Sequence, residues 1–210
     1  MAYIEFPPFN FTDEDGTARG SITELARDLA ARAGYTITFR SYPAKRLAET
    51  IVRGDADFWI GLPTLENFAD GTITSSIPVG SIHLRAYSKN PMPPIRSKKD
   101  LDGKHIIILH GYSYGDWFEY IHDPKNKIIY ESAFSHKQAL LMLLNRPVDY
   151  LLDYKLPVSL AKKNMEVPEL FSNEVYAFER RIVVSKKTHR ADEVLRRLEA
   201  AYTSIKLQSQ

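Results

Sequence analysis

Apolar and polar residues alternate along the first part of the chain in a way that predicts strands and helices in turn. Residues 3–11 (YIEFPPFNF) are aromatic and extended, and their two prolines exclude a helix. Residues 21–33 carry apolar side chains at helical spacing, and Ser21 with Glu24 is typical of a capping box at the start of this helix. Gly34 is suited to end it, and residues 35–42 (YTITFRSY) alternate as a strand does.

A second helix and a short buried strand follow. Residues 44–53 have a buried apolar stripe between Pro43, which suits a first helical turn, and Gly54, which suits a helix end. Residues 56–61 (ADFWIG) are almost continuously apolar, which is typical of a strand covered on both faces of a parallel sheet. Residues 63–74 are expected to form a polar loop. This order of elements predicts an α/β fold with a mostly parallel sheet.

A proline-dense break at residues 89–94 (KNPMPP) separates a second group of elements from the first. The same patterns predict further strands at residues 81–88, 105–109, 127–130, 148–153 and 175–185, and further helices at 114–120 and 135–145. A last amphipathic helix carries its apolar face over residues 194–205.

This last helix indicates how the domains are organised. The second group is complete without it, whereas the first sheet would have an uncovered face. We therefore expect a discontinuous first lobe, residues 1–85 plus 180–210, and an inserted second lobe, residues 86–179. Two lobes joined by two crossing strands form a hinge with a ligand cleft between them.

Composition narrows the function by exclusion. The 210 residues carry a net charge of +2, so a nucleic-acid reader that works by bulk positive charge is excluded. With 44% hydrophobic and 26% charged residues, the chain has the proportions of a core-forming protein. The absence of cysteine removes thiolate catalysis, cysteine-ligated zinc and disulfides, and the six histidines lack the i, i+4 spacing of a helical metal pair. No metal or cofactor is expected.

Targeting signals are not visible in the sequence. No apolar run approaches the roughly 20 residues that a membrane-spanning helix needs. No basic, apolar and small-residue signal segment opens the chain either, so such a segment is either absent by nature or has been removed.

Several short motifs occur in an order that matches one known family, and together they extend over nearly the whole chain. They are residues 7–11 (PPFNF), 42–46 (YPAKR), 54–57 (GDAD), 74–78 (TSSIP), 100–104 (DLDGK), 111–113 (GYS) and 145–149 (NRPVD), followed by Asp153. Each motif is weak alone, but the ordered set resembles the bacterial extracellular solute-binding proteins of family 3, which have the type II periplasmic-binding fold.

The resemblance implies a function as well as a fold. It implies a monomeric periplasmic protein that captures a small polar solute, performs no chemistry and delivers the solute to an ABC transporter permease. The same fold also implies two alternatives: the ligand-sensing domain of a membrane signalling protein, and a periplasmic dehydratase in which Glu5 or Asp153 acts as general acid.

One position departs from the family. Amino-acid-binding members have an arginine that clamps the ligand α-carboxylate, and Asn67 stands at the matching place. An amide donates a single uncharged hydrogen bond and cannot form the charged two-pronged contact of a guanidinium. Binding of a standard α-amino acid is therefore put in question.

Polar and aromatic side chains at turns and strand ends are the candidate ligand-binding residues. They are Glu5, Phe9, Trp59, Asn67, Ser75, Ser76, Tyr112, Ser113, His136 and Asp153. A structural role remains open for several of them. Trp59 fits a core, Ser113 fits a helix cap, His136 fits the surface, and Asp153 fits a helix cap or an ion pair with Lys155.

Overall fold

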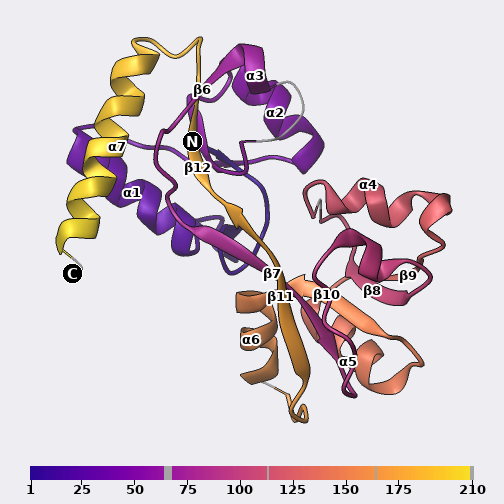
Figure 1. Ribbon diagram of the computed structural model, residues 1–210. Helices are drawn as coiled ribbons and strands as arrows, with labels where there is room; N and C mark the ends of the chain where they lie inside the picture. The colour runs from indigo at the N-terminus through magenta and orange to yellow at the C-terminus, as the bar shows by residue number, and fades with distance from the viewer. Residues whose placement is uncertain (64–67, 113, 164, 209–210) are drawn as a thin grey trace. The chain divides into compact units, whose positions relative to one another are not determined.

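The computed structural model describes residues 1–63, 68–112, 114–163 and 165–208. They fall into two compact units (Figure 1). Unit 1 comprises Met1–Ser81 and Glu179–Gln210, and unit 2 comprises Ile82–Phe178. In the part of the chain that is described, no helix has the length and apolarity needed to cross a membrane.

Unit 1 begins with two short strand pairs. Strand β1 (Ala2–Tyr3) pairs in parallel with β4 (Arg40–Ser41), and β2 (Phe11–Thr12) pairs antiparallel with β3 (Ala18–Arg19). The strand expected over residues 3–11 is therefore interrupted, because the Pro7–Pro8 segment forms a turn closed by hydrogen bonds between Phe6 and Asn10. The strand expected over residues 35–42 is confined to β4.

Helix α1 (Ser21–Ala33) lies where the apolar spacing predicts it, and Gly34 ends it in the left-handed conformation as expected. The expected capping box is wrong, because Gly20 is the N-cap and no side chain caps this end. The first turn donates its N–H groups to the N-terminal segment instead: Ser21 N to Pro8 O at 3.2 Å and Ile22 N to Phe9 O at 2.9 Å. Backbone carbonyls have taken the place of a side-chain cap.

Helix α2 (Ala44–Arg53) follows Pro43 and ends at Gly54, as the sequence predicts. The polar loop expected over residues 63–74 is only partly a loop. Its described part contains the short helix α3 (Phe68–Gly71) and strand β6 (Thr72–Thr74).

The main sheet of unit 1 has the order β5-β12-β6. Strand β12 (Arg181–Ser185) lies between β5 (Phe58–Gly61) and β6, and it runs antiparallel to both. The parallel pairing expected for β5 is therefore wrong, because the central strand comes from the C-terminal part of the chain. Helix α7 (Ala191–Gln208) packs on α1 and on β12, and so covers this sheet as the last amphipathic helix was expected to do (Figure 1).

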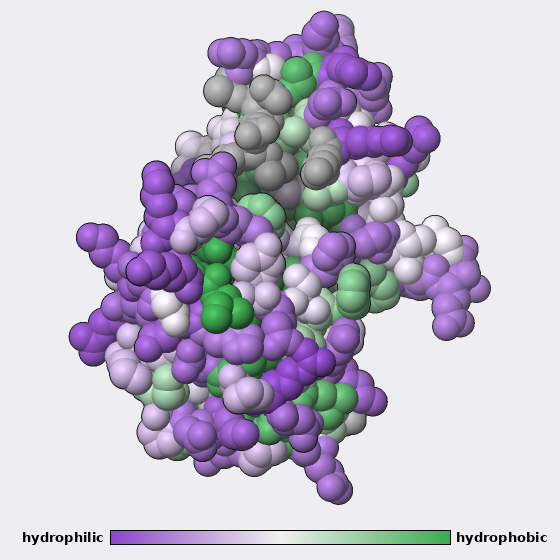
Figure 2. Space-filling view, turned by 90° about the vertical axis from the view of Figure 1, so that its right-hand side faces the viewer, coloured by the Kyte–Doolittle hydropathy of each residue, from purple (hydrophilic) through white to green (hydrophobic). Residues whose placement is uncertain are grey.

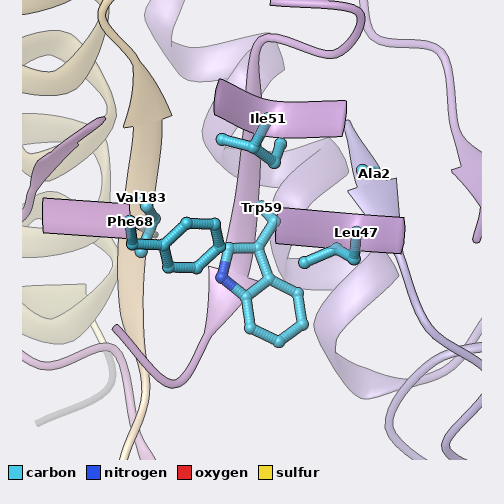
Figure 3. Packing of buried hydrophobic residues seen from close by; sticks show 6 residues of the cluster. All are labelled: Ala2, Leu47, Ile51, Trp59, Phe68 and Val183. Atoms are coloured by element: carbon cyan, nitrogen blue, oxygen red, sulfur yellow. The ribbon is translucent and has the colours of Figure 1, made fainter. Parts of the chain in front are cut away.

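The core of unit 1 gathers around the indole of Trp59. Figure 3 shows its ring between the side chains of Phe68 and Leu47, with Ile51, Val183 and Ala2 nearby. All six residues of this cluster are at most 5% exposed. The cluster therefore joins α2, α3, β1, β5 and the C-terminal strand β12 through contacts between side chains that lie far apart in sequence.

Unit 2 is built on a five-stranded sheet with the order β11-β7-β10-β8-β9. The strands are β7 (Ser81–Ser88), β8 (His105–Leu109), β9 (Ile129–Ala133), β10 (Tyr150–Tyr154) and β11 (Phe171–Glu179). Strand β8 is parallel to β9 and β10, whereas β10 is antiparallel to β7. The expected β7 and β8 are confirmed at the same residues, and the single strand expected over 175–185 is divided at Arg180 into β11 and β12.

Short helices and turns connect these strands. They are η1 (Lys98–Leu101), α4 (Trp117–His122), η2 (Pro124–Asn126), α5 (His136–Asn145) and α6 (Lys155–Lys163). Helix α4 begins later than expected, because Tyr114 and Gly115 both have positive φ values that a helix does not allow. Helix α6 was not expected from the sequence. On the face that Figure 2 displays, small hydrophobic areas lie among predominantly hydrophilic residues.

Candidate functional site

The most connected group of predicted site residues lies in unit 2, where α5 begins beside β10. Ser135 caps α5 by accepting a hydrogen bond from the Gln138 N–H at 3.1 Å, which places His136 in the first helical turn. Asp153 lies near the carboxyl end of β10, and α5 packs on this strand. The end of a parallel strand and the start of a helix thus bring the imidazole and the carboxylate together.

Asp153 is completely buried and doubly hydrogen-bonded. Its Oδ2 lies 2.7 Å from His136 Nδ1, and its Oδ1 accepts the backbone N–H of Tyr154 at 2.6 Å. A buried carboxylate requires such partners, because an unpaired one would cost several kcal/mol, about 2–7 for a polar group alone. Asp153 is therefore paired with a histidine and not with Lys155, one of the alternatives that the sequence left open.

Tyr112 extends this arrangement toward solvent. Its hydroxyl lies 3.2 Å from His136 Nε2, and the two rings are 5.8 Å apart. The result is a hydrogen-bonded chain, Tyr112–His136–Asp153, that runs from a half-buried phenol to a buried carboxylate. All three members are residues that the sequence identified as candidates.

Aromatic rings surround the hydrogen-bonded residues Tyr112, His136 and Asp153. Tyr114 stacks on Tyr154 with a centroid distance of 5.7 Å, and Tyr112 lies 5.9 Å from Tyr154. The fully buried Tyr114 hydroxyl accepts the Leu109 N–H and donates to the Leu152 carbonyl. It thus ties β8 to β10 just before the site. Tyr114 and Tyr154 contact the candidate site and were not identified from the sequence, although the tyrosine-rich turn after β8 was noted there.

Burial shifts the pKa values of Asp153 and Tyr112. It raises the pKa of Asp153, and the hydrogen bond and charge of His136 act in the opposite direction. Burial also raises the pKa of the Tyr112 hydroxyl, and the nearby charge of Asp153 adds to this effect. Tyr112 therefore stays protonated at neutral pH and can both donate and accept hydrogen bonds.

The geometry predicts an unusual tautomer for His136. A carboxylate only accepts hydrogen bonds, so Nδ1 should carry the proton that points to Asp153. We expect long-range proton–nitrogen NMR spectra at pH 7.5 to show His136 Nδ1 protonated, and Asp153→Leu to remove this preference. A spectrum of the unsubstituted protein with His136 protonated only at Nε2 would contradict the hydrogen-bonded chain.

In unit 1, Glu5 is engaged by its own neighbourhood. Its carboxylate accepts the backbone N–H of Thr12 at 3.0 Å and the Thr12 hydroxyl at 2.7 Å. Burial would raise the pKa of Glu5, but hydrogen bonds from Thr12 and Ser41 together lower it. The hydroxyl of Tyr3, on the same segment, also forms a hydrogen bond with the Thr12 hydroxyl at 2.7 Å. Glu5 thus fastens the N-terminal segment to β2.

Two further aromatic candidates are buried in unit 1. Phe9 is 6% exposed and packs against Phe6, with 5.0 Å between ring centroids. Trp59 is 5% exposed and stands in the core described above. Their assignment as ligand contacts stays a prediction.

The serine pair after β6 is hydrogen-bonded within unit 1. The Ser75 hydroxyl donates to Ile77 O at 2.8 Å and accepts the Ile182 N–H at 3.0 Å. The Ser76 N–H and hydroxyl both donate to one carboxylate oxygen of Glu199, at 2.5 and 2.9 Å. These contacts fasten the end of β6 to β12 and α7. Asn67 and Ser113 lie outside the described residues.

Two further features bear on the chemistry. Unit 2 has a pocket of about 190 Å³ lined by Pro93, Tyr150 and Asn173 among others, and none of the predicted site residues that the structure describes lines it. Among residues 1–63, 68–112, 114–163 and 165–208, no group of three or more histidine, aspartate or glutamate side chains is placed to hold a metal ion.

Known structures resemble the chain over nearly its full length. A histidine kinase sensor domain with similarity to periplasmic binding proteins matches with a TM-score of 0.74 and 19% identity, covering 100% of this chain and 90% of its own. An ancestral arginine-binding protein bound to arginine matches with a TM-score of 0.70 and 20% identity, covering 99% of this chain and 92% of its own. The ancestral amino acid-binding protein AncCDT-1, a precursor of cyclohexadienyl dehydratase, matches with a TM-score of 0.69 and 17% identity, covering 99% of this chain and 88% of its own.

These likenesses show the fold, which is the type II periplasmic-binding fold predicted from the sequence. No curated protein matches the chain in a sequence search. The family model described as bacterial extracellular solute-binding proteins, family 3, matches residues 2–208. The chain therefore belongs to family 3 of the bacterial extracellular solute-binding proteins.

Proposed function

We propose that this chain is a periplasmic receptor that captures a small polar solute, leaves it chemically unchanged and delivers it to the permease of an ABC importer. The observation that carries the proposal is the series of hydrogen bonds that links Tyr112, His136 and Asp153. It offers a solute oriented polar groups at its half-buried end. Its carboxylate has no exposed surface from which to act directly as a general acid or nucleophile.

Amino-acid-like molecules and other small organic solutes are the ligand class that this proposal favours. One neighbour is an arginine-binding protein with arginine bound, which supports a polar solute of that size. The polar groups of the site also support it, because imidazole and phenol side chains recognise such molecules through hydrogen bonds and ring contacts.

The test is a solute screen on protein that has been unfolded and refolded to remove bound material. We expect one class among the twenty amino acids, succinate, putrescine and ribose to raise the melting temperature and to give saturable 1:1 binding by calorimetry. Tyr112→Phe should weaken that binding by roughly tenfold, because it removes one hydrogen bond from the site. If no small polar solute binds, the proposal is wrong.

The second candidate function is that of a ligand-sensing domain in a membrane signalling protein, because one structurally similar protein is a histidine kinase sensor domain. The two functions differ in their partner. An importer-coupled receptor with its solute should stimulate ATP hydrolysis by the reconstituted transporter. A sensing domain should bind the same solute without that stimulation.

A dehydratase is less favoured, and a product assay separates it from a receptor. The AncCDT-1 likeness provides the reason to test it. After prolonged incubation with the protein, the solute should be recovered unchanged. Turnover that disappears in Asp153→Asn or Glu5→Gln would instead establish an enzyme.

A further inference from the structure

Two neighbouring arginines, Arg180 just before β12 and Arg181 at its start, differ in the hydrogen bonds of their side chains. The Arg181 guanidinium is hydrogen-bonded through both terminal nitrogens: Nη1 donates to Ser75 O and Ser76 O at 2.8 and 2.7 Å, and Nη2 donates to the Glu179 carboxylate at 2.8 Å. In Arg180, by contrast, Nε and Nη1 are buried without a hydrogen-bond partner, and no ion pair between the described residues includes this side chain.

The backbone and its neighbours hold Arg180 in place. Its N–H donates to Gly80 O, and its carbonyl accepts the Val79 N–H, both at 2.8 Å. The guanidinium carbon lies 5.3 Å from the centroid of the Phe9 ring. A Cβ on Gly80 would lie 2.5 Å from Arg180 Nη2, so the glycine leaves the space that the guanidinium occupies.

This arrangement costs free energy unless an acceptor completes it. Burial lowers the pKa of Arg180, and a nearby interaction with Tyr202 acts in the opposite direction. The Phe9 ring attracts the cation, typically by about 0.5–2 kcal/mol, but it accepts none of the N–H groups that lack a partner. The residue as a whole is partly exposed, although Nε and Nη1 are not.

An anion supplies what is missing. A carboxylate can accept hydrogen bonds from two N–H groups of a guanidinium at once, either from Nε and Nη2 or from Nη1 and Nη2. Both pairs include Nη2, the nitrogen that lies next to Gly80. We propose that Arg180 is the residue of unit 1 that binds a carboxylate group of the solute, with Phe9 supporting the guanidinium from its face. This inference rests on the proposed function and adds to it that the solute is an acid.

The matched variants are Arg180→Met and Arg181→Met, both tested with the solute panel used above. We expect Arg180→Met to fold with an unchanged or higher melting temperature, because it removes an unsatisfied buried charge. It should lose carboxylate binding by roughly tenfold to a hundredfold. Arg181→Met should show the reverse, with a lower melting temperature and retained carboxylate affinity, because its partners lie within unit 1. Arg180→Lys keeps a charge without the fork and should also bind more weakly.

Each outcome decides between the two proposals. If a solute without an acidic group binds and all carboxylates fail, or if Arg180→Met and Arg180→Lys keep full carboxylate affinity, the role of Arg180 is wrong and the receptor function stands. If no member of the panel binds the unsubstituted protein, the receptor function and the role of Arg180 both fall.

Discussion

Replacing His136 by alanine should lower the free energy of unfolding by about 3 kcal/mol at pH 7.5. The substitution removes the imidazole that faces Asp153 and leaves a carboxylate with no exposed surface and one remaining N–H donor, from Tyr154. Removing the hydrogen-bond partner of a buried polar group typically costs about 1–3 kcal/mol, and more where the group left behind is charged, as the Asp153 carboxylate is, so a loss of about 3 kcal/mol is expected. Urea unfolding measures it.

The pH dependence of this variant follows from the same contact. Burial already raises the pKa of Asp153, and without His136 nothing at that oxygen opposes the effect. Below the pKa of the unfolded chain the carboxyl is protonated in both states, and no penalty arises. As pH rises from the unfolded pKa through the elevated folded pKa the penalty grows, so His136→Ala should be more stable at pH 5 than at pH 7.5.

The control is the double variant His136→Ala with Asp153→Asn. Because the neutral amide carries no charge to be left unpaired, adding Asp153→Asn should recover most of the lost stability. Equal losses with and without Asp153→Asn would show that His136 contributes packing only, and that the pairing with Asp153 contributes nothing measurable.

Replacing Trp59 by alanine should lower the free energy of unfolding by about 3–5 kcal/mol, the usual cost of emptying a large aromatic site. The indole fills the space between Phe68 and Leu47 (Figure 3), and Gly61, on which a Cβ would lie 2.1 Å from the ring, has no side chain to occupy the space left by alanine. Thermal and urea unfolding measure the loss.

Trp59→Phe is the matched variant, because it keeps an aromatic ring in the core and removes an indole N–H that has no hydrogen-bond partner among the described residues. It should cost much less than alanine. If Trp59→Phe keeps stability and yet abolishes solute binding, Trp59 is a ligand contact as the sequence suggested. If binding and stability are both retained, its role is confined to the core.

The sequence predicted those elements whose causes are local. Gly34 and Gly54 end their helices in the left-handed conformation because glycine accepts it without strain. Strand β8 occupies the residues that its apolar run indicates. In the site, the turn residue Tyr112, the helix-start residue His136 and the strand-end residue Asp153 were each identified from their position.

What the sequence did not predict depends on partners far along the chain. Ser21 looked like the first residue of a capping box, but carbonyls of Pro8 and Phe9 accept from the start of that helix. The direction of β5 depends on β12, which returns from the C-terminal part. Arg180 and Arg181 are indistinguishable as letters, and only the fold shows that the Arg181 guanidinium is hydrogen-bonded while Nε and Nη1 of Arg180 have no partner among the described residues.

The central position of β12 has a consequence for synthesis on the ribosome. Unit 2 is continuous in sequence and can fold as soon as Phe178 has left the exit tunnel. Strands β5 and β6 must wait, with open edges that invite pairing with other chains, until β12 arrives between them. The order of translation therefore leaves the edges of β5 and β6 without their central strand for longest, although these strands are made first.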